Sequence, residues 1–259
     1  MKSAVARSAT PPIGPPLGRA YIGTSGWNYD SWRETFYEGC PRREWLARCA
    51  QHFSAIEVNA TFYRLQSLET FRRWRTQTPP DFRFAIKANR YLTHNMKLAH
   101  PLDPIVLERS RAAGLGAKLA AVVWQLPRTL HRNLPRLEAF ARALRHWRNT
   151  RHAIEFRHPS WFDDDVAACL QDRGIAVCQS DSADWPLWDA VTTDLVYVRL
   201  HGHTVTYASG YSDRELRSWA GRVRRWRRER RDVHVYFDND AWGYAPRDAV
   251  KLIDMIHAD

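Results

Sequence analysis

The chain has 259 residues, of which 44% are hydrophobic and 12% aromatic, so it can bury the core of one large α/β domain or of two small ones. No apolar run approaches the length of a membrane-spanning helix and the start of the chain lacks the apolar core of a signal peptide, so we expect a cytoplasmic protein without membrane partners. The net charge of +11 comes almost entirely from arginine and favours anionic partners, but it also fits an arginine-rich proteome with no special partner.

In chain order, a proline- and glycine-rich stretch comes first and is followed by a regular alternation of apolar patterns. Residues 1–19 are predicted to form a disordered arm. Strands are predicted at 21–25, 55–59, 82–87, 120–126, 152–156, 174–180, 195–201 and 233–238. Helices are predicted at 42–53, 67–76, 104–114, 134–147, 162–172, 213–230 and 246–257. Eight strands that alternate with helices, without a linker, predict a single (β/α)8 barrel of the TIM type over residues 20–259.

Side-chain alternation places ionisable residues inside this predicted barrel. In "AIEVN", Ala55 and Glu57 share one face of the strand, whereas Ile56 and Val58 share the face that suits packing under helices. The same parity points six further ionisable side chains inward, each near the C-terminal end of its strand: Lys87, Glu155, Arg157, Arg199, His201 and Asp238. In such barrels the C-terminal strand ends meet at one mouth, so these seven residues are predicted to be neighbours.

The predicted cluster has the composition of a catalytic site. The catalytic candidates are Glu57, Lys87, Glu155, His201 and Asp238. The two glutamates suit general acid/base chemistry, Lys87 and His201 suit proton donation or electrostatic stabilisation, and Arg157 and Arg199 are expected to clamp an anion. The alternative is a structural plug, in which the charges pair with one another and do no chemistry.

Further polar and aromatic side chains follow the predicted strands, where a sugar ring or a base could stack. The candidate ligand-binding residues are Ser25, Trp27, Tyr29, Asn59, Tyr63, His94, Gln125, Arg157, Trp161, Asp181, Arg199, Tyr207, Tyr211 and Asn239. No metal is predicted, because the histidines and carboxylates lack a local spacing such as His-Glu-x-x-His. The sequence specifies no cofactor and leaves the oligomeric state open.

The most basic segment is "RVRRWRRERR" at 222–231. Barrel helices run antiparallel to their strands, so the arginine-rich end of the predicted helix 213–230 should lie at the far end of the barrel from the mouth. We interpret this segment as a solvated outer helix face, with polyanion binding as the alternative.

Seven ordered motifs resemble the YecE-like family, domain-of-unknown-function family seventy-two. They are "YIGTSGWNYDSW", "IEVNATFYRL", "FAIKANRYLTH", "VVWQLP", "IEFRHPSWF", "VYVRLHG" and "VYFDNDAWGYAPRDA". The resemblance runs from about Tyr21 to the C-terminus and implies a TIM-type barrel, but no settled reaction. Fold analogy alone relates such barrels to abasic-site endonucleases. The family pattern leads us to expect Asn at position 238, where this chain has Asp.

Taken together, these features favour an enzyme that binds a phosphate- or carboxylate-bearing ligand at the barrel mouth and uses Glu, Lys and His side chains for acid-base chemistry. One alternative is a barrel that binds nucleic acid, or a DNA-repair-type phosphodiesterase. The other is a non-catalytic scaffold with a structural polar plug.

Overall fold

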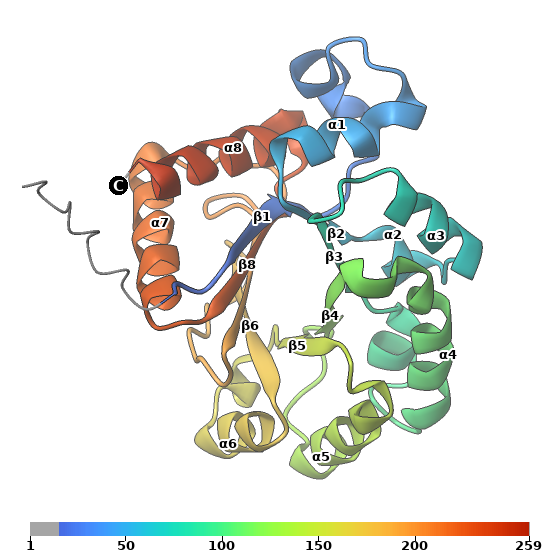
Figure 1. Cartoon of the computed structure of the whole chain (residues 1–259). Coiled ribbons are helices and arrows are strands. Elements are labelled where there is room, and N and C mark those ends of the chain that lie inside the picture. Colours follow the sequence, from blue (N-terminus) through green and yellow to red (C-terminus); the bar gives the residue numbers. More distant parts are fainter. Residues whose placement is uncertain (1–15, 259) are drawn as a thin grey trace, which may run out of the picture.

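Eight parallel strands surround a central axis, and helices cover the outside of the ring (Figure 1). The computed structural model describes residues 16–258, so the predicted arm at 1–19 lies mostly outside the described residues. The strands are β1 (Ala20–Thr24), β2 (Ala55–Val58), β3 (Arg83–Lys87), β4 (Leu119–Gln125), β5 (Arg151–Glu155), β6 (Ile175–Asp181), β7 (Leu195–Leu200) and β8 (Asp232–Phe237). Strands β2 to β8 pair in sequence order and β1 pairs with β8, while a bridge between Ser25 and Glu57 joins β1 to β2, which confirms the predicted (β/α)8 barrel.

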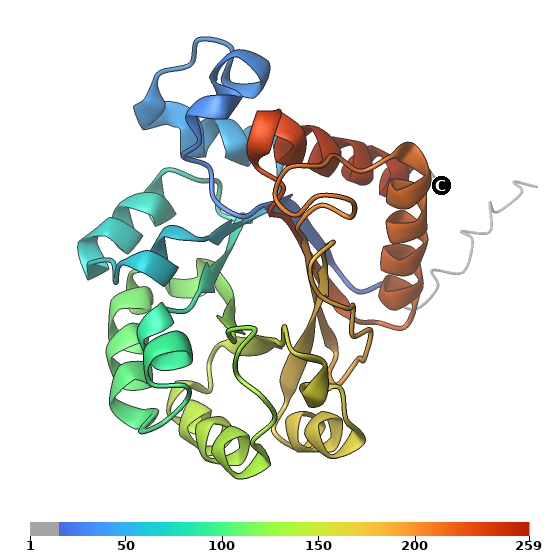
Figure 2. The same ribbon diagram turned by 180° about the vertical axis from the view of Figure 1, so that it is seen from behind.

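Residues 16–258 form eight α-helices around the strands (Figure 2), of which seven lie where helices were predicted, and no α-helix separates β6 from β7. They are α1 (Trp45–His52), α2 (Ala60–Tyr63), α3 (Leu68–Thr76), α4 (Leu102–Ala112), α5 (Leu134–Ala143), α6 (Asp164–Asp172), α7 (Asp213–Arg228) and α8 (Tyr244–His257). The sequence did not predict α2, which is a single turn without amphipathic periodicity. Helix α7 begins at a capping box, in which the Ser212 hydroxyl accepts from the Glu215 N–H and the Glu215 carboxylate accepts from the Ser212 N–H. No helix within residues 16–258 is long and apolar enough to cross a bilayer.

The interior of the barrel combines small residues on one side with large ones on the other. The buried interior cluster contains alanines at 55, 85, 121, 153 and 176, on β2 to β6, opposite Tyr197 and Tyr236 on β7 and β8. The branched residues of alternate parity, such as Ile56 and Val198, pack in the outer core under the helices. The alanines therefore leave room inside for the bulky side chains of β7 and β8, including Arg199.

The barrel closes between β1 and β2 through a short bridge. Ser25 pairs with Glu57, and the Gly26 N–H donates to the Glu57 carbonyl at 2.7 Å. A Cβ atom on Gly23 would lie 1.8 Å from the carbonyl oxygen of Ala55, so glycine is required where the two backbones approach. This closure brings Ser25 beside the carboxylate of Glu57.

The arginine-rich end of α7 lies at the opposite end of the barrel from the C-terminal strand ends, as predicted. The Arg227 guanidinium donates to the carbonyl of Gly18, and the Gly18 N–H donates to the carbonyl of Arg227. Gly18 lies two residues before β1, so this contact fixes the helix end beside the N-terminal end of that strand.

Candidate functional site

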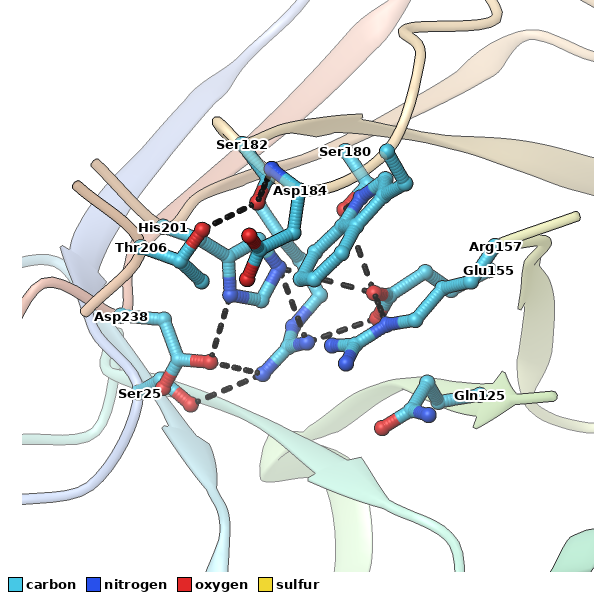
Figure 3. A network of polar contacts seen from close by, with 12 residues as sticks. Ser25, Gln125, Glu155, Arg157, Ser180, Ser182, Asp184, His201, Thr206 and Asp238 are labelled. Carbon is cyan, nitrogen blue, oxygen red and sulfur yellow. Dashed lines mark hydrogen bonds and ion pairs between the residues drawn. The ribbon is translucent and has the colours of Figure 1, made fainter. Parts of the chain in front are cut away.

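The C-terminal ends of the strands bring all seven predicted ionisable residues to one place, which we call the mouth. Six of them, from four different strands or the loops after them, are linked by hydrogen bonds and ion pairs. Figure 3 shows the part of this network that includes Glu155, Arg157, His201 and Asp238. The seventh, Lys87, is the last residue of β3, and its ammonium interacts electrostatically with Arg199, Asp238, Glu155 and Arg157. The structure thus brings together residues that lie up to 181 positions apart, from Glu57 to Asp238.

Arg199 is the centre of this network and is completely buried. Its Nε and Nη2 donate to Glu57 at 3.0 and 2.8 Å, Nη1 donates to Glu155 at 2.6 Å, and Nη2 also donates to Asp238 at 2.9 Å. Nη1 donates in addition to Nε2 of His201 at 3.2 Å. Because a guanidinium has five N–H groups, these protein acceptors use all of them. Arg199 therefore holds three carboxylates in place.

His201 is oriented by charged neighbours. Nε2 of His201 lies 3.2 Å from Nη1 of Arg199 and 3.5 Å from Oε1 of Glu155. Nδ1 is 2.9 Å from Oδ2 of Asp238. At position 238, where the resemblance led us to expect Asn, this chain places a carboxylate that contacts both Arg199 and His201.

Two carboxylates at the mouth, Glu155 and Asp238, are held in the ionised form. Burial opposes ionisation of Glu155, but Arg157 and Arg199 lower its pKa well below 4.5. Burial likewise opposes ionisation of Asp238, but Arg199 and the His201 contact lower its pKa. Both oxygens of Glu57 accept hydrogen bonds, from Ser25 at 2.6 Å and from Tyr197 at 2.6 Å. Glu155 and Asp238 therefore act as fixed negative charges at neutral pH.

Lys87 is the exception in this paired network. Its side chain is 5% exposed and its Nζ lies 4.2 Å from the centre of the Phe62 ring. Within residues 16–258, Nζ has no hydrogen bond and no ion pair closer than 4 Å. Burial and the charge of Arg199 lower the pKa of Lys87 from 10.5 to about 8. Lys87 is therefore a titratable ammonium near neutral pH.

Arg157 lies beside the mouth with one unused nitrogen. Its Nε donates to Glu155 at 2.7 Å, its Nη1 donates to Tyr207 at 3.3 Å, and its guanidinium lies 3.9 Å from the centre of the Trp185 ring. Nη2 is buried and has no hydrogen-bond partner among the described residues. An acceptor brought to Nη2 would complete the guanidinium's hydrogen bonding.

A groove of about 650 Å³ adjoins the mouth beyond β1 and β2. Its lining includes the aromatic residues Trp27, Tyr29, Tyr63 and Trp74, the arginines Arg42, Arg43 and Arg73, and Asn59. Tyr29 donates to the carbonyl of Ser25 at 2.7 Å, which links the groove to the mouth, and Oδ1 of Asn59 is buried without a partner in the described chain. We call this feature the rim groove.

Other predicted ligand residues are occupied by contacts within the protein. Trp161 is 1% exposed and donates to the carbonyl of Leu130, while Tyr211 is 3% exposed and donates to Asp181. Asn239 donates to the Ser209 carbonyl and to the Asp248 carboxylate. The rings of Trp161 and Tyr211 are thus packed in the core and present no open face for stacking, contrary to expectation.

Two predicted polar residues border Lys87 on the β3 and β4 side. Gln125 is the last residue of β4, and its Nε2 lies 3.4 Å from Nε2 of His94. Burial and the nearby Lys87 lower the pKa of His94 to about 4. His94 is therefore neutral at physiological pH and offers ring nitrogens for hydrogen bonding.

Sequence reasoning missed the apolar and hydroxyl residues that support the charges. They are Phe62 under Lys87, Trp185 over Arg157, Tyr197 on Glu57 and Ser180 on Glu155. The inward parity of β7, which was used for Arg199, also points Tyr197 inward and could have identified it. Phe62 and Trp185 lie in segments without regular alternation, so no local pattern indicated their partners.

The described residues 16–258 contain no group of three or more His, Cys, Asp or Glu side chains arranged to hold a metal ion.

Comparison with known proteins places the chain in a family. The model of the family described as "Protein of unknown function DUF72" matches residues 21–259. UPF0759 protein YecE of Escherichia coli K12 is 33% identical over 156 residues, which are 60% of this chain and 54% of YecE, so the match spans about half of that relative. UPF0759 protein YunF of Bacillus subtilis is 24% identical over 275 residues, covering 91% of this chain and 94% of YunF.

Solved structures of the same family have the same fold. A DUF72 family protein from Thermotoga maritima is similar with a TM-score of 0.83 at 26% identity, covering 92% of this chain and 99% of that one. A DUF72 family protein from Enterococcus faecalis is similar with a TM-score of 0.78 at 20% identity, covering 92% and 95%. Because the family model spans nearly the whole described barrel, this chain belongs to the DUF72 family.

Proposed function

We propose that this DUF72 protein is an enzyme that binds a small phosphate- or carboxylate-bearing ligand at the mouth and transfers protons with Lys87. One observation carries the proposal: Lys87 Nζ and Arg157 Nη2 lack partners among the described residues, whereas the donors of Arg199 are all used. A buried cation without a partner is costly, and an anionic ligand would supply one. Unpaired, perturbed groups of this kind are typical of functional sites.

In this proposal the seven ionisable residues have different roles. Lys87, with a pKa of about 8, exchanges protons with the ligand at neutral pH, where Glu155 and Asp238 stay ionised. Glu57, Glu155 and Asp238 hold Arg199, which acts as an organiser rather than as an anion clamp. Arg157 takes the clamp role, because its Nη2 is the guanidinium nitrogen that remains unpaired.

The charge balance supports an anionic ligand. Three carboxylates face three cationic side chains at the mouth, so the site carries no net negative charge that would repel an anion. The rim groove adds three arginines and, within the described chain, no carboxylate to its lining. The body of the ligand would extend into this groove, where aromatic rings offer stacking surfaces.

The rim groove also favours a second candidate, the binding of a nucleic-acid end without catalysis. Basic and aromatic side chains in one groove are typical of single-strand binding sites. The two functions differ in salt dependence. For a polyanion, a plot of log affinity against log salt concentration falls more steeply by roughly one unit of slope for each phosphate contact. A small ligand at the mouth would show a much shallower dependence.

Thermal unfolding with inorganic phosphate, sulfate and ribose 5-phosphate tests the proposed function, each variant being compared with its own ligand-free state. A ligand at a hundred times its Kd stabilises the native state by about 2.7 kcal/mol. We expect this stabilisation in the wild type, its loss in Lys87→Met and Arg157→Gln, and its retention in the distant control Arg225→Gln. Asp238→Asn should bind the anions more tightly, because it removes one negative charge. Equal stabilisation of all four variants, or of none of the proteins, contradicts the proposal.

A further inference from the structure

We propose that Lys87 forms an imine with its ligand, so that the substrates are aldehydes or ketones that also carry a phosphate or carboxylate group. This inference rests on the proposed function, because it uses the same mouth and the same anionic group. The geometry points to it: Nζ lies at the C-terminal end of β3, nearly buried, against the face of Phe62, with no hydrogen bond or ion pair in the described chain.

A lysine attacks a carbonyl carbon only with a free lone pair on Nζ. Two other lysines of this chain have acceptors for their ammonium groups. Lys118 donates to two backbone carbonyls at 2.7 Å each, and Lys251 pairs with Asp213 at 2.8 Å. Lys87 has no such acceptor in the described chain, and the Phe62 ring keeps water from one side of its nitrogen. Lys87 therefore lacks the contacts that occupy the nitrogens of Lys118 and Lys251.

The electrostatic surroundings of Lys87 act in the same direction. Arg199 and Arg157 disfavour the ammonium, Asp238 and Glu155 favour it, and burial shifts the balance toward the neutral amine. With a pKa of about 8, about one tenth of Lys87 is neutral at pH 7, against about one in three thousand for a lysine with a pKa of 10.5. This supplies a nucleophile without any separate base.

The covalent step balances in protons and electrons. The Lys87 ammonium first releases one proton to solvent, and the Nζ lone pair then forms the C–N bond while the carbonyl π pair moves to oxygen. The two protons left on nitrogen move to that oxygen, which leaves as water as the C=N bond forms, and one proton returns from solvent to the imine nitrogen. The protonated imine carries the single positive charge that the ammonium carried, so its interaction with Asp238 and Glu155 is preserved. No oxidant or reductant is required, and Arg157 Nη2 is free to hold the ligand's anionic group.

A lysine that only attracts anions would behave differently from one that forms an imine. Arginine at position 87 keeps the positive charge but cannot form an imine, because it stays protonated. Lys87→Arg therefore separates the two roles, and Lys251→Arg is the matched control at an exposed, paired lysine.

The test is reductive trapping on the full chain. Wild type, Lys87→Arg and Lys251→Arg are incubated with glyoxylate, pyruvate or glyceraldehyde 3-phosphate and then treated with sodium borohydride, which reduces an imine to a stable secondary amine. The chain has only five lysines, at 2, 87, 97, 118 and 251, so peptide mass mapping identifies the site. We expect an adduct at Lys87 to form at least about tenfold faster than at any other lysine, following its larger neutral fraction. It should be absent in Lys87→Arg and unchanged in Lys251→Arg.

Adducts distributed over the exposed lysines, or no adduct with any of the three carbonyl compounds, overturn the imine. If phosphate still stabilises the wild type in that case, the proposed anion site stands and only the covalent step fails. If phosphate stabilisation is absent too, both proposals fail. Should Lys87→Arg not fold, the site of the adduct in the wild type decides the question by itself.

Discussion

Replacing Lys87 by methionine should make the protein more stable. Methionine has nearly the volume of lysine but no charge, so it can fill the space beside Phe62 without the cost of a buried ammonium. Lowering the pKa of Lys87 from 10.5 to about 8 corresponds to about 3 kcal/mol at 1.36 kcal/mol per pKa unit. We therefore expect the free energy of unfolding to rise by about 2–3 kcal/mol at pH 7.

The gain should depend on pH in a defined direction. Because the folded-state pKa of Lys87 lies below that of the unfolded chain, the unfolded state binds more protons between about pH 8 and 10.5. The wild type consequently gains stability over this range, and the advantage of Lys87→Met shrinks to about 1 kcal/mol at pH 9.5. Urea unfolding of both proteins at pH 7 and pH 9.5 measures the difference while other titrating groups cancel.

Lys251→Met is the matched control, because Lys251 is an exposed lysine paired with Asp213. Its effect should stay within about 1 kcal/mol at both pH values. If Lys87→Met instead lost several kcal/mol at both pH values, Lys87 would be a structural partner of the carboxylates. The plug hypothesis would then replace the functional one.

Three further perturbations test the rest of the structure. Arg199→Met leaves its buried carboxylates unpaired and should lower the free energy of unfolding at pH 7 by at least about 3–5 kcal/mol in urea titrations; a loss below about 1 kcal/mol contradicts its central role. Gly23→Ala should prevent the close approach of β1 and β2 and lower the melting temperature strongly. Gly221→Ala is the control: a Cβ atom there meets no other atom, so the melting temperature should rise slightly. Equal effects of the two substitutions would refute the argument that Gly23 allows the barrel to close. Neutralising Arg225 and Arg228 should abolish any nucleic-acid binding by α7 but leave intact the stabilisation of the protein by phosphate in thermal unfolding. Loss of that stabilisation would mean that the anion binds at α7 rather than at the mouth.

The sequence alone determined the architecture and the membership of the mouth. The eight apolar strand segments, separated by helical patterns, can be recognised from local sequence. So can the inward direction of Glu57 and Arg199, because side chains alternate between the two faces of a strand. Because all strands of such a barrel are parallel, a residue at the C-terminal end of any strand belongs to the same mouth. Strand ends were predicted within one residue, because the apolar runs that mark them are local features of the sequence.

Only the tertiary structure decided which of these charges are paired. Glu57 and Arg199 are 142 positions apart, and their pairing depends on barrel closure, on the room left by the interior alanines and on side-chain length. The five N–H donors of Arg199 are used by acceptors from β2, from β5 and from the C-terminal ends of β7 and β8. Among the described residues, no carboxylate of this network lies within ion-pair distance of Lys87. Sequence periodicity indicates the direction of a side chain, whereas the distance between two side chains depends on the packing of the whole barrel.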